Sequence, residues 1–153
     1  MNEVRIERVG PRPLAAIRAT TSRRRLGTDI VRLLDIIWPV LRELKVRTGH
    51  NVVVYQGNQG GTLLVDVGVE ALSEFAARGE IRATSTPSGE VATTAYHGEY
   101  SDLAPAYAAL ERTCRETGRR PAGVSWEVYG DWDDDPARRR TDLFLLLEPE
   151  PRG

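Results

Sequence analysis

The sequence predicts an α+β fold, in which two strand–helix–strand–strand modules in a pseudo-two-fold arrangement form an antiparallel sheet with both helices on one face. Amphipathic segments at residues 28–48 and 101–117 each follow a strand-like segment. Each is followed by two further strand-like segments. The stretches RTGHNVVVYQG and ETGRRPAGVSWEVYG also resemble each other, which indicates an internal repeat.

The first half of the chain contains a strand, a helix and a hairpin. Residues 3–9 and 13–20 are predicted as one strand interrupted by GPRP, because proline cannot donate to a central ladder. In the helix at 28–48, Pro39 is expected to produce a kink and Gly49 to mark the end. NVVVYQG and TLLVDVGVE then form two strands joined by the turn NQGG.

The second half repeats this order. EIRATS and EVATTAYHG are predicted to form a hairpin around the turn TPSG, and the helix at 101–117 ends at Gly118. GVSWEVYG is a strand, DWDDDPARRR a charged loop and TDLFLLLEP the last strand. We therefore expect a first module over about residues 3–70 and a second over about 80–148, within one domain covering 1–153.

Composition narrows the class of protein. The chain has 153 residues and a formal net charge of -1, which argues against nucleic acid as a direct partner. Cys114 is the single cysteine, so no intramolecular disulfide is possible. No apolar run is long enough to span a membrane, and the N-terminus does not resemble a signal peptide. These features predict a cytoplasmic protein without membrane attachment.

The sequence offers little for metal or cofactor chemistry. His50 and His97 have no partner at ligand spacing, so no metal site is expected. The acidic stretch DWDDDP begins like a calcium loop, but Pro136 stands where such a loop needs glycine. No Ser-His-Asp set, phosphate loop or dinucleotide fingerprint is present, so no cofactor is expected.

The most informative residue is a carboxylate in the middle of the strand-like stretch GVSWEVYG. Strand alternation puts Glu127 and Tyr129 on one face, with Trp126 and Val128 on the other. Glu127 is either an acid on an edge strand that points into water, or a carboxylate that faces a ligand. The position that aligns with it in the first half is Val53, so the fold itself does not need an acid here.

Four stretches resemble the GyrI-like family, the effector-binding domain of AraC-type and MerR-type regulators. These are TPSGEVA, YHGEYSDL, RRPAGVSWEVY and TDLFLLL, which lie in this order between about residues 86 and 147. The junction that often reads Gly-Pro-Tyr in the family is Gly98-Glu99-Tyr100 here. The resemblance implies a standalone small-molecule-binding domain, since the chain has no room for a DNA-binding module beside the repeat.

The resemblance also implies a site. Members of the family bind small molecules, often lipophilic cations, in a central groove, and the position of the ligand-contacting glutamate is Glu127. Aromatic residues on elements expected to face this groove suit a flat cation, because ring faces attract positive charge. Trp132 is expected in a loop that closes over the site. The candidate ligand-binding residues are Glu127, Tyr129, Trp38, Tyr55, Tyr107, Phe144 and, near a strand end, Tyr96.

Three functions remain open at this stage. The first is binding of lipophilic, aromatic cations, as in multidrug recognition or sequestration. The second is a hydrolase of the same fold that opens strained cyclopropane-type natural products, with Glu127 as the catalytic base and Tyr55 or Tyr129 as the acid. The third is a protein-interaction inhibitor such as a gyrase modulator.

Overall fold

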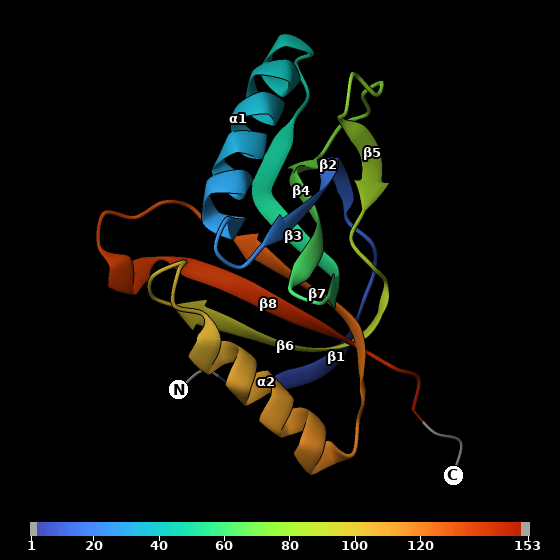
Figure 1. Ribbon diagram of the computed structural model, residues 1–153, viewed down its shortest axis with the longest axis vertical. Helices are drawn as coiled ribbons and strands as arrows, with labels where there is room; N and C mark the ends of the chain where they lie inside the picture. The colour runs from blue at the N-terminus through green and yellow to red at the C-terminus, as the bar shows by residue number, and fades with distance from the viewer. Residues whose placement is uncertain (1–2, 151–153) are drawn as a thin grey trace. The chain divides into compact units, whose positions relative to one another are not determined.

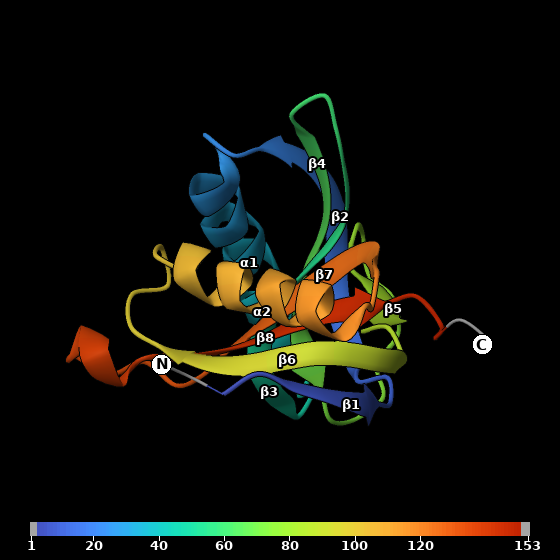
Figure 2. The ribbon, with the colours of Figure 1, turned by 90° about the horizontal axis from the view of Figure 1, so that it is seen from below.

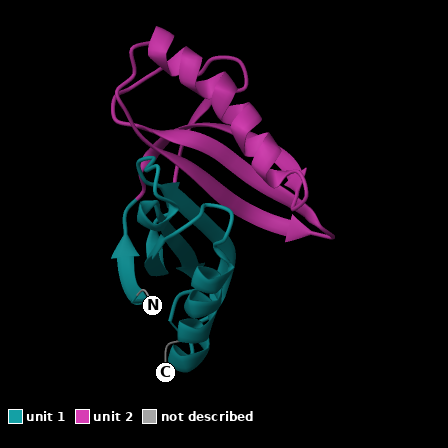
Figure 3. Ribbon diagram, turned by 90° about the vertical axis from the view of Figure 1, so that its left-hand side faces the viewer, with its two compact units in different colours: residues 1–10, 87–153 teal, residues 11–86 magenta. Residues whose placement is uncertain are grey.

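The computed structural model describes residues 3–150 and divides the chain into two compact units (Figure 3). Unit 1 comprises residues 1–10 and 87–153, and unit 2 comprises residues 11–86. Within residues 3–150, each unit contains one α-helix and four strands, and these strands pair antiparallel within the unit. The predicted α+β class with antiparallel pairing is therefore confirmed. No helix within residues 3–150 is long and apolar enough to cross a membrane.

Unit 2 contains a sheet with the strand order β3-β4-β2-β5 and the helix α1 (Figure 1). The long strands β3 and β4 are joined by the predicted turn, where Gly60 and Gly61 both have positive φ angles. The elements are β2 (Pro13–Ser22), α1 (Leu26–Glu43), β3 (Thr48–Gln59), β4 (Thr62–Ala71) and β5 (Arg82–Ser85).

Helix α1 differs from its prediction at the C-terminal end. It continues through Pro39 but stops at Glu43, so the predicted extension to residue 48 is wrong. Lys45 takes the left-handed conformation, with φ of 57°, and the Val46 N–H donates to the Leu41 carbonyl at 3.0 Å. This is the Schellman pattern that usually has glycine at the left-handed position, which is why Gly49 was mistaken for the end.

Unit 1 contains a sheet with the strand order β1-β6-β8-β7 and the helix α2 (Figures 1 and 2). Helix α2 packs on this sheet through a core that includes Leu110, Cys114 and Leu143. Gly118, with φ of 71°, ends the helix as predicted. The elements are β1 (Arg5–Val9), β6 (Gly89–His97), α2 (Ala104–Thr117), β7 (Pro121–Tyr129), the 3-10 helix η1 (Pro136–Arg138) and β8 (Arg140–Leu147).

Two strand assignments from the sequence are wrong. β1 and β2 are not one interrupted strand, because β1 pairs with β6 in unit 1 and β2 pairs with β4 in unit 2. β5 does not form a hairpin with β6 but pairs with β2. Thr86 explains the second difference, since its N–H donates to the Arg12 carbonyl at 3.0 Å and its hydroxyl accepts from the Arg12 N–H at 2.9 Å. These bonds hold the end of β5 beside the start of β2.

The two units have equivalent topologies. The strand order β7-β8-β6-β1 of unit 1 matches the order β3-β4-β2-β5 of unit 2. Along the chain, each unit contains a strand–helix–strand–strand series, which is β6-α2-β7-β8 in unit 1 and β2-α1-β3-β4 in unit 2. Strand β1 is therefore the outer strand of unit 1, which contains the helix and strands of the predicted second module. From the sequence, residues 3–9 had been grouped with the first module.

Candidate functional site

Glu127 lies on strand β7, on the face of the unit 1 sheet that carries helix α2. Its cross-strand neighbour on β8 is Leu143, a member of the core that α2 covers. Tyr129 lies two residues further along the same face, opposite Thr141. Glu127 is only 4% exposed, so the sequence alternative of an edge acid pointing into water is wrong.

Two tyrosines from different elements donate hydrogen bonds to this carboxylate. The Tyr107 hydroxyl, on α2, donates to Glu127 Oε2, and the Tyr129 hydroxyl, on β7, donates to Glu127 Oε1 at 2.5 Å. The two carboxylate oxygens thus each have their own phenol donor. Tyr107 lies three residues before Leu110, so the helix periodicity that builds the core also directs Tyr107 toward β7.

These hydrogen bonds explain how a buried acid is tolerated. Burying even a neutral polar group without a hydrogen-bond partner costs roughly 2–7 kcal/mol, and burying an unpaired carboxylate costs more. Hydrogen bonds to an ionised acceptor are about twice as strong as neutral ones and favour the charged form. The two phenols therefore give each carboxyl oxygen of this buried acid a hydrogen-bond donor, in a setting made of aromatic rings.

The aromatic surroundings extend outward from Tyr129. The Tyr100 ring meets the Tyr129 ring edge-on, with 5.4 Å between centroids and 67° between planes. The Trp132 ring lies 6.3 Å from Tyr100 at a tilt of 57°. The Tyr100 hydroxyl donates to the Gly130 carbonyl at 3.2 Å, which ties the start of the β7–β8 loop to the β6–α2 connection.

The pKa of Tyr100 keeps this hydroxyl a donor. Burial raises its pKa above the ordinary value, Arg139 acts in the opposite direction, and Asp131 raises it again. The phenol is therefore neutral at physiological pH. A neutral phenol donates to a carbonyl, as Tyr100 does to Gly130.

Arg139 fixes the loop that carries Trp132. Its guanidinium lies 3.6 Å from the centroid of the Trp132 ring, and its Nη1 pairs with Glu99 Oε2 at 2.9 Å. Its Nε donates to the Asp133 carbonyl at 2.8 Å. One side chain thus connects the loop before β8 to the residues before α2.

The structure places two further predicted residues relative to Glu127. Tyr96 shares its face, because it pairs with Thr141 on β8, and it packs against the core under α2. Gly98 leaves room for this ring, since a Cβ there would come within 2.9 Å of it. Phe144 pairs with Trp126 on the face opposite to Glu127, where the two rings stack 5.1 Å apart, and its role in ligand binding remains a prediction.

Trp38 and Tyr55 belong to unit 2. The Trp38 indole N–H donates to Asn51 Oδ1 at 2.9 Å, and Tyr55 lies opposite Val65 in the β3–β4 pair. Their predicted place beside Glu127 remains a prediction. Val53, which aligns with Glu127 in the sequence, is fully buried opposite Val67, so unit 2 has an apolar side chain at the equivalent position.

Sequence reasoning gave no role at the site to Tyr100 or Arg139. Tyr100 was visible only as part of the junction Gly98-Glu99-Tyr100, and Arg139 only as a member of a basic run. Both act through contacts between segments that are distant in the sequence, 30 residues apart for Tyr100 and Gly130 and 40 for Arg139 and Glu99. No periodicity within one element reveals such a contact.

The described part of the chain offers no evident metal centre. Within residues 3–150, no group of three or more His, Cys, Asp or Glu side chains is placed to hold a metal ion. Two acids of the β7–β8 loop accept from its own backbone, since Asp133 accepts from the Asp135 N–H at 2.9 Å and Asp135 from the Ala137 N–H at 3.0 Å. Cys114 is buried in the core under α2, and burial raises the pKa of its thiol.

Solved structures with the same fold include regulators and a hydrolase. The EcmrR C-terminal domain has a TM-score of 0.77 and 15% identity, with 97% of this chain and 98% of that chain covered. In the EcmrR–DNA complex the TM-score is 0.76 at 15% identity, and the match covers 96% of this chain but 57% of EcmrR. The chain thus spans little more than half of the EcmrR chain in that complex.

Two further solved structures have lower sequence identity to this chain. SAV2435 bound to tetraphenylphosphonium has a TM-score of 0.72 and 11% identity, with 96% of this chain and 94% of that chain covered. A hydrolase from Listeria innocua has a TM-score of 0.62 and 9% identity, with 95% and 92% covered. At these identities the likeness shows the fold alone. No curated protein sequence matches the chain.

The sequence itself matches a family model. The match spans residues 2–148 and therefore includes β7 with Glu127, helix α2 with Tyr107, and the loop with Trp132. It agrees with the α+β fold and antiparallel pairing of both units. The chain belongs to the GyrI-like small molecule binding domain family.

Proposed function

We propose that this protein binds lipophilic, aromatic cations, with Glu127 as the group that recognises the positive charge. The observation that carries the proposal is the buried Glu127 carboxylate, 4% exposed and held by the hydroxyls of Tyr107 and Tyr129. A fold does not need a buried acid here, since the equivalent position in unit 2 is Val53. Recognition of a cationic ligand explains why an acid stands at this position.

The chemistry of the surroundings selects the class of ligand. A cation near Glu127 gains Coulomb attraction that is stronger than in water, because the carboxylate lies in a medium of low dielectric constant. The rings of Tyr107 and Tyr129 add cation–π and apolar contacts, worth about 0.5–2 kcal/mol for each ring face that a cation meets. A small, strongly hydrated cation gains the attraction but not the apolar contact. An aromatic or otherwise lipophilic cation gains both.

The same features allow the site to accept a range of different cations. Ring faces and a single carboxylate impose few directional hydrogen bonds, so cations of different shapes satisfy them. This favours recognition or sequestration of several lipophilic cations over tight selection of one. SAV2435, which shares the fold, is a protein described in complex with tetraphenylphosphonium, and this cation is therefore a suitable probe.

The proposal is tested by calorimetric titration of tetraphenylphosphonium into three forms of the protein. Wild type is expected to bind, and Glu127→Gln to bind about 5- to 150-fold more weakly, from about 1–3 kcal/mol for a lost charged interaction. Glu111→Gln is the matched control, because Glu111 is an exposed acid on α2 and its loss changes the net charge equally. Equal affinity of Glu127→Gln and wild type would disprove the role of Glu127.

A hydrolase is the second candidate, favoured by the direct contact between an acid and two phenols. Glu127 would take a proton from a water whose oxygen bonds to a carbon of the cyclopropane ring as a ring C–C bond breaks. The Tyr129 phenol would donate a proton to the atom that receives the electron pair of the broken bond, and would regain one from Glu127 across their hydrogen bond. Incubation with a cyclopropane-containing alkylating compound would then give a water-added product. If Glu127→Gln still binds the compound but forms no product, the hydrolase is supported. Absence of product with wild type leaves binding as the function.

A further inference from the structure

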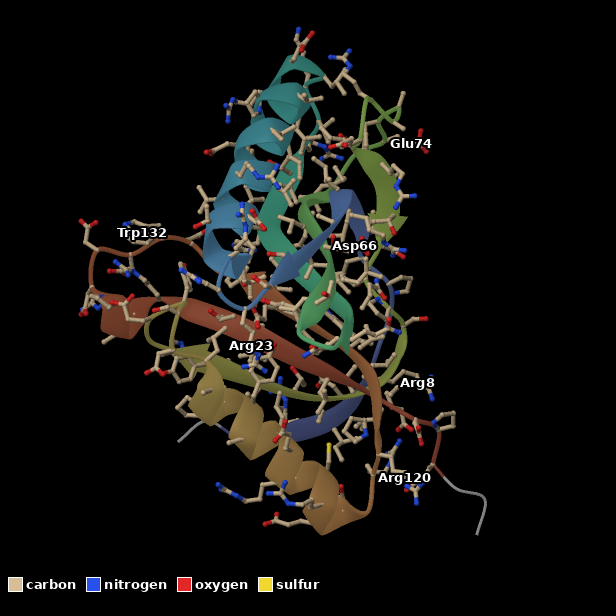
Figure 4. The ribbon with its side chains drawn as sticks, in the orientation of Figure 1. Arg8, Arg23, Asp66, Glu74, Arg120 and Trp132 are labelled. Carbon is tan, nitrogen blue, oxygen red and sulfur yellow. The ribbon has the colours of Figure 1, made fainter. Side chains whose placement is uncertain are left out.

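A second aromatic feature lies outside the tyrosines that bond to Glu127. We call the rings of Tyr100 and Trp132 the outer shelf. Trp132 is 66% exposed, whereas Trp126 on the opposite face of β7 is 2% exposed. Figure 4 shows Trp132 on the loop between β7 and β8. The outer shelf is continuous with the site, because Tyr100 contacts Tyr129 and Tyr129 bonds to Glu127.

The exposed indole is held in a defined position. Arg139 covers one of its faces at 3.6 Å, and its Nε1–H donates to Asp134 Oδ1 at 3.3 Å. Arg139 is itself fixed by Glu99 and by the Asp133 carbonyl. Ordering a large side chain that remains in water costs conformational entropy without burying its surface. Single exposed apolar residues are common, but a ring held at several points beside a binding site has the features of a contact surface.

We propose that the outer shelf binds a second, neutral aromatic group of a ligand whose cation lies at Glu127. This inference rests on the function proposed above and specifies the ligand class further: a cationic group joined to an aryl group at some distance from the charge. Trp132 supplies a large ring, and Tyr100 connects it to Tyr129. The outer shelf thereby discriminates between short and extended cations.

The charge near the outer shelf argues that the second group is neutral. The Arg139 guanidinium already occupies one face of Trp132, which is the position a second cation would prefer. A second positive charge would also meet that of Arg139, even though Glu99 partly compensates it. A neutral ring avoids both costs and retains ring stacking. The proposal therefore predicts different responses to a neutral and a charged extension of one cation.

The test uses three cations with the same head group. These are benzyltrimethylammonium, its 4-benzyloxy derivative, and the same derivative with a second trimethylammonium group on the outer ring. Calorimetric titration into wild type is expected to show about 3- to 10-fold tighter binding of the neutral extension than of the short cation, since ring pairs are worth roughly 0.5–1.5 kcal/mol. The doubly charged compound is expected to show no such increase.

Trp132→Ala is expected to remove this increase while binding the short cation as wild type does. Trp132→Phe, which keeps a ring, is expected to restore part of it. Leu72→Ala is the control, because Leu72 is an apolar side chain of similar exposure, 57%, in unit 2. A Trp132→Ala protein that keeps the full increase overturns the outer shelf, and so does one that weakens all three cations equally.

The same titrations separate this inference from the proposed function. If wild type binds the short cation and Glu127→Gln does not, the proposed function stands whatever Trp132→Ala shows. If wild type binds none of the three cations, the proposed function fails and the outer shelf fails with it.

Discussion

At the scale of single residues, the sequence singled out Glu127 and Tyr129 but gave no role to Tyr100 or Arg139. Glu127 was singled out because an apolar strand rarely has a carboxylate at its middle. The structure shows that this carboxylate is buried, as the apolar residues around it are. Strand alternation correctly placed Tyr129 beside it. Phe144 lies on the face opposite to Glu127, which the sequence could not show, because the relative face depends on the register between β7 and β8 and alternation within a single strand does not reveal it.

Asp66, on β4 of unit 2, provides a residue-scale prediction about pH (Figure 4). The Arg18 guanidinium donates to both of its oxygens, at 2.9 and 3.1 Å, and Gln56 donates at 2.9 Å. Burial by itself raises the pKa of Asp66, but the hydrogen bonds from Arg18 and Gln56 and the charge of Arg18 outweigh it, so the pKa lies below its ordinary value.

Because the pKa of Asp66 is lowered in the folded protein, its ionised form stabilises the fold at pH values above 3.8, the ordinary pKa of the group. This stabilisation is lost as the pH falls below 3.8 and through the pKa of the folded state. Asp66→Asn is expected to lower the free energy of unfolding by about 1–3 kcal/mol at pH 7. Urea denaturation at pH 7 and at pH 3 measures the difference, which should shrink at the lower pH. A difference that is equal at both values would contradict this role of the Asp66 charge.

At the scale of elements, helix ends and strand partners were the least predictable features. The spacing of apolar residues located both helices. In α1, Leu33, Ile37 and Leu41 recur at helical spacing and form one apolar face, which is buried in the structure. The end of α1 was missed because lysine rarely adopts the left-handed conformation that Lys45 shows. The partner of β5 was missed because pairing with β2 joins segments that are distant in the sequence.

Lys45 leads to a prediction about stability. A residue with a side chain is strained at φ of 57°, whereas glycine adopts this angle without a steric cost. Lys45→Gly is therefore expected to raise the free energy of unfolding by about 1 kcal/mol, less the entropy that glycine gains in the unfolded chain. Thermal or urea denaturation measures the change. Lys45→Ala, which keeps a Cβ, is the control and should bring no such increase; a fall in stability for Lys45→Gly would refute the explanation.

At the scale of the whole molecule, the repeated element order predicted the two modules, and the family resemblance predicted a small-molecule-binding domain. The order strand–helix–strand–strand is visible in the sequence because each element has its own periodicity and turn residues. The place of β1 in unit 1 was not visible, because residues 5–9 pair with residues at least eighty positions away. Proximity in the sequence favoured grouping residues 3–9 with the segment that follows them.

The central claim is that one buried carboxylate, Glu127, gives this protein its preference for positive charge. Tetraphenylphosphonium and tetraphenylborate test it most directly, because they share a shape of four phenyl rings and differ in the sign of their charge. The measurement is a pair of calorimetric titrations on wild type and on Glu127→Gln. Wild type should bind the cation at least about tenfold more tightly than the anion, equivalent to about 1.4 kcal/mol, and the variant should lose most of this preference. A variant that keeps the full preference for the cation would show that the selectivity arises elsewhere.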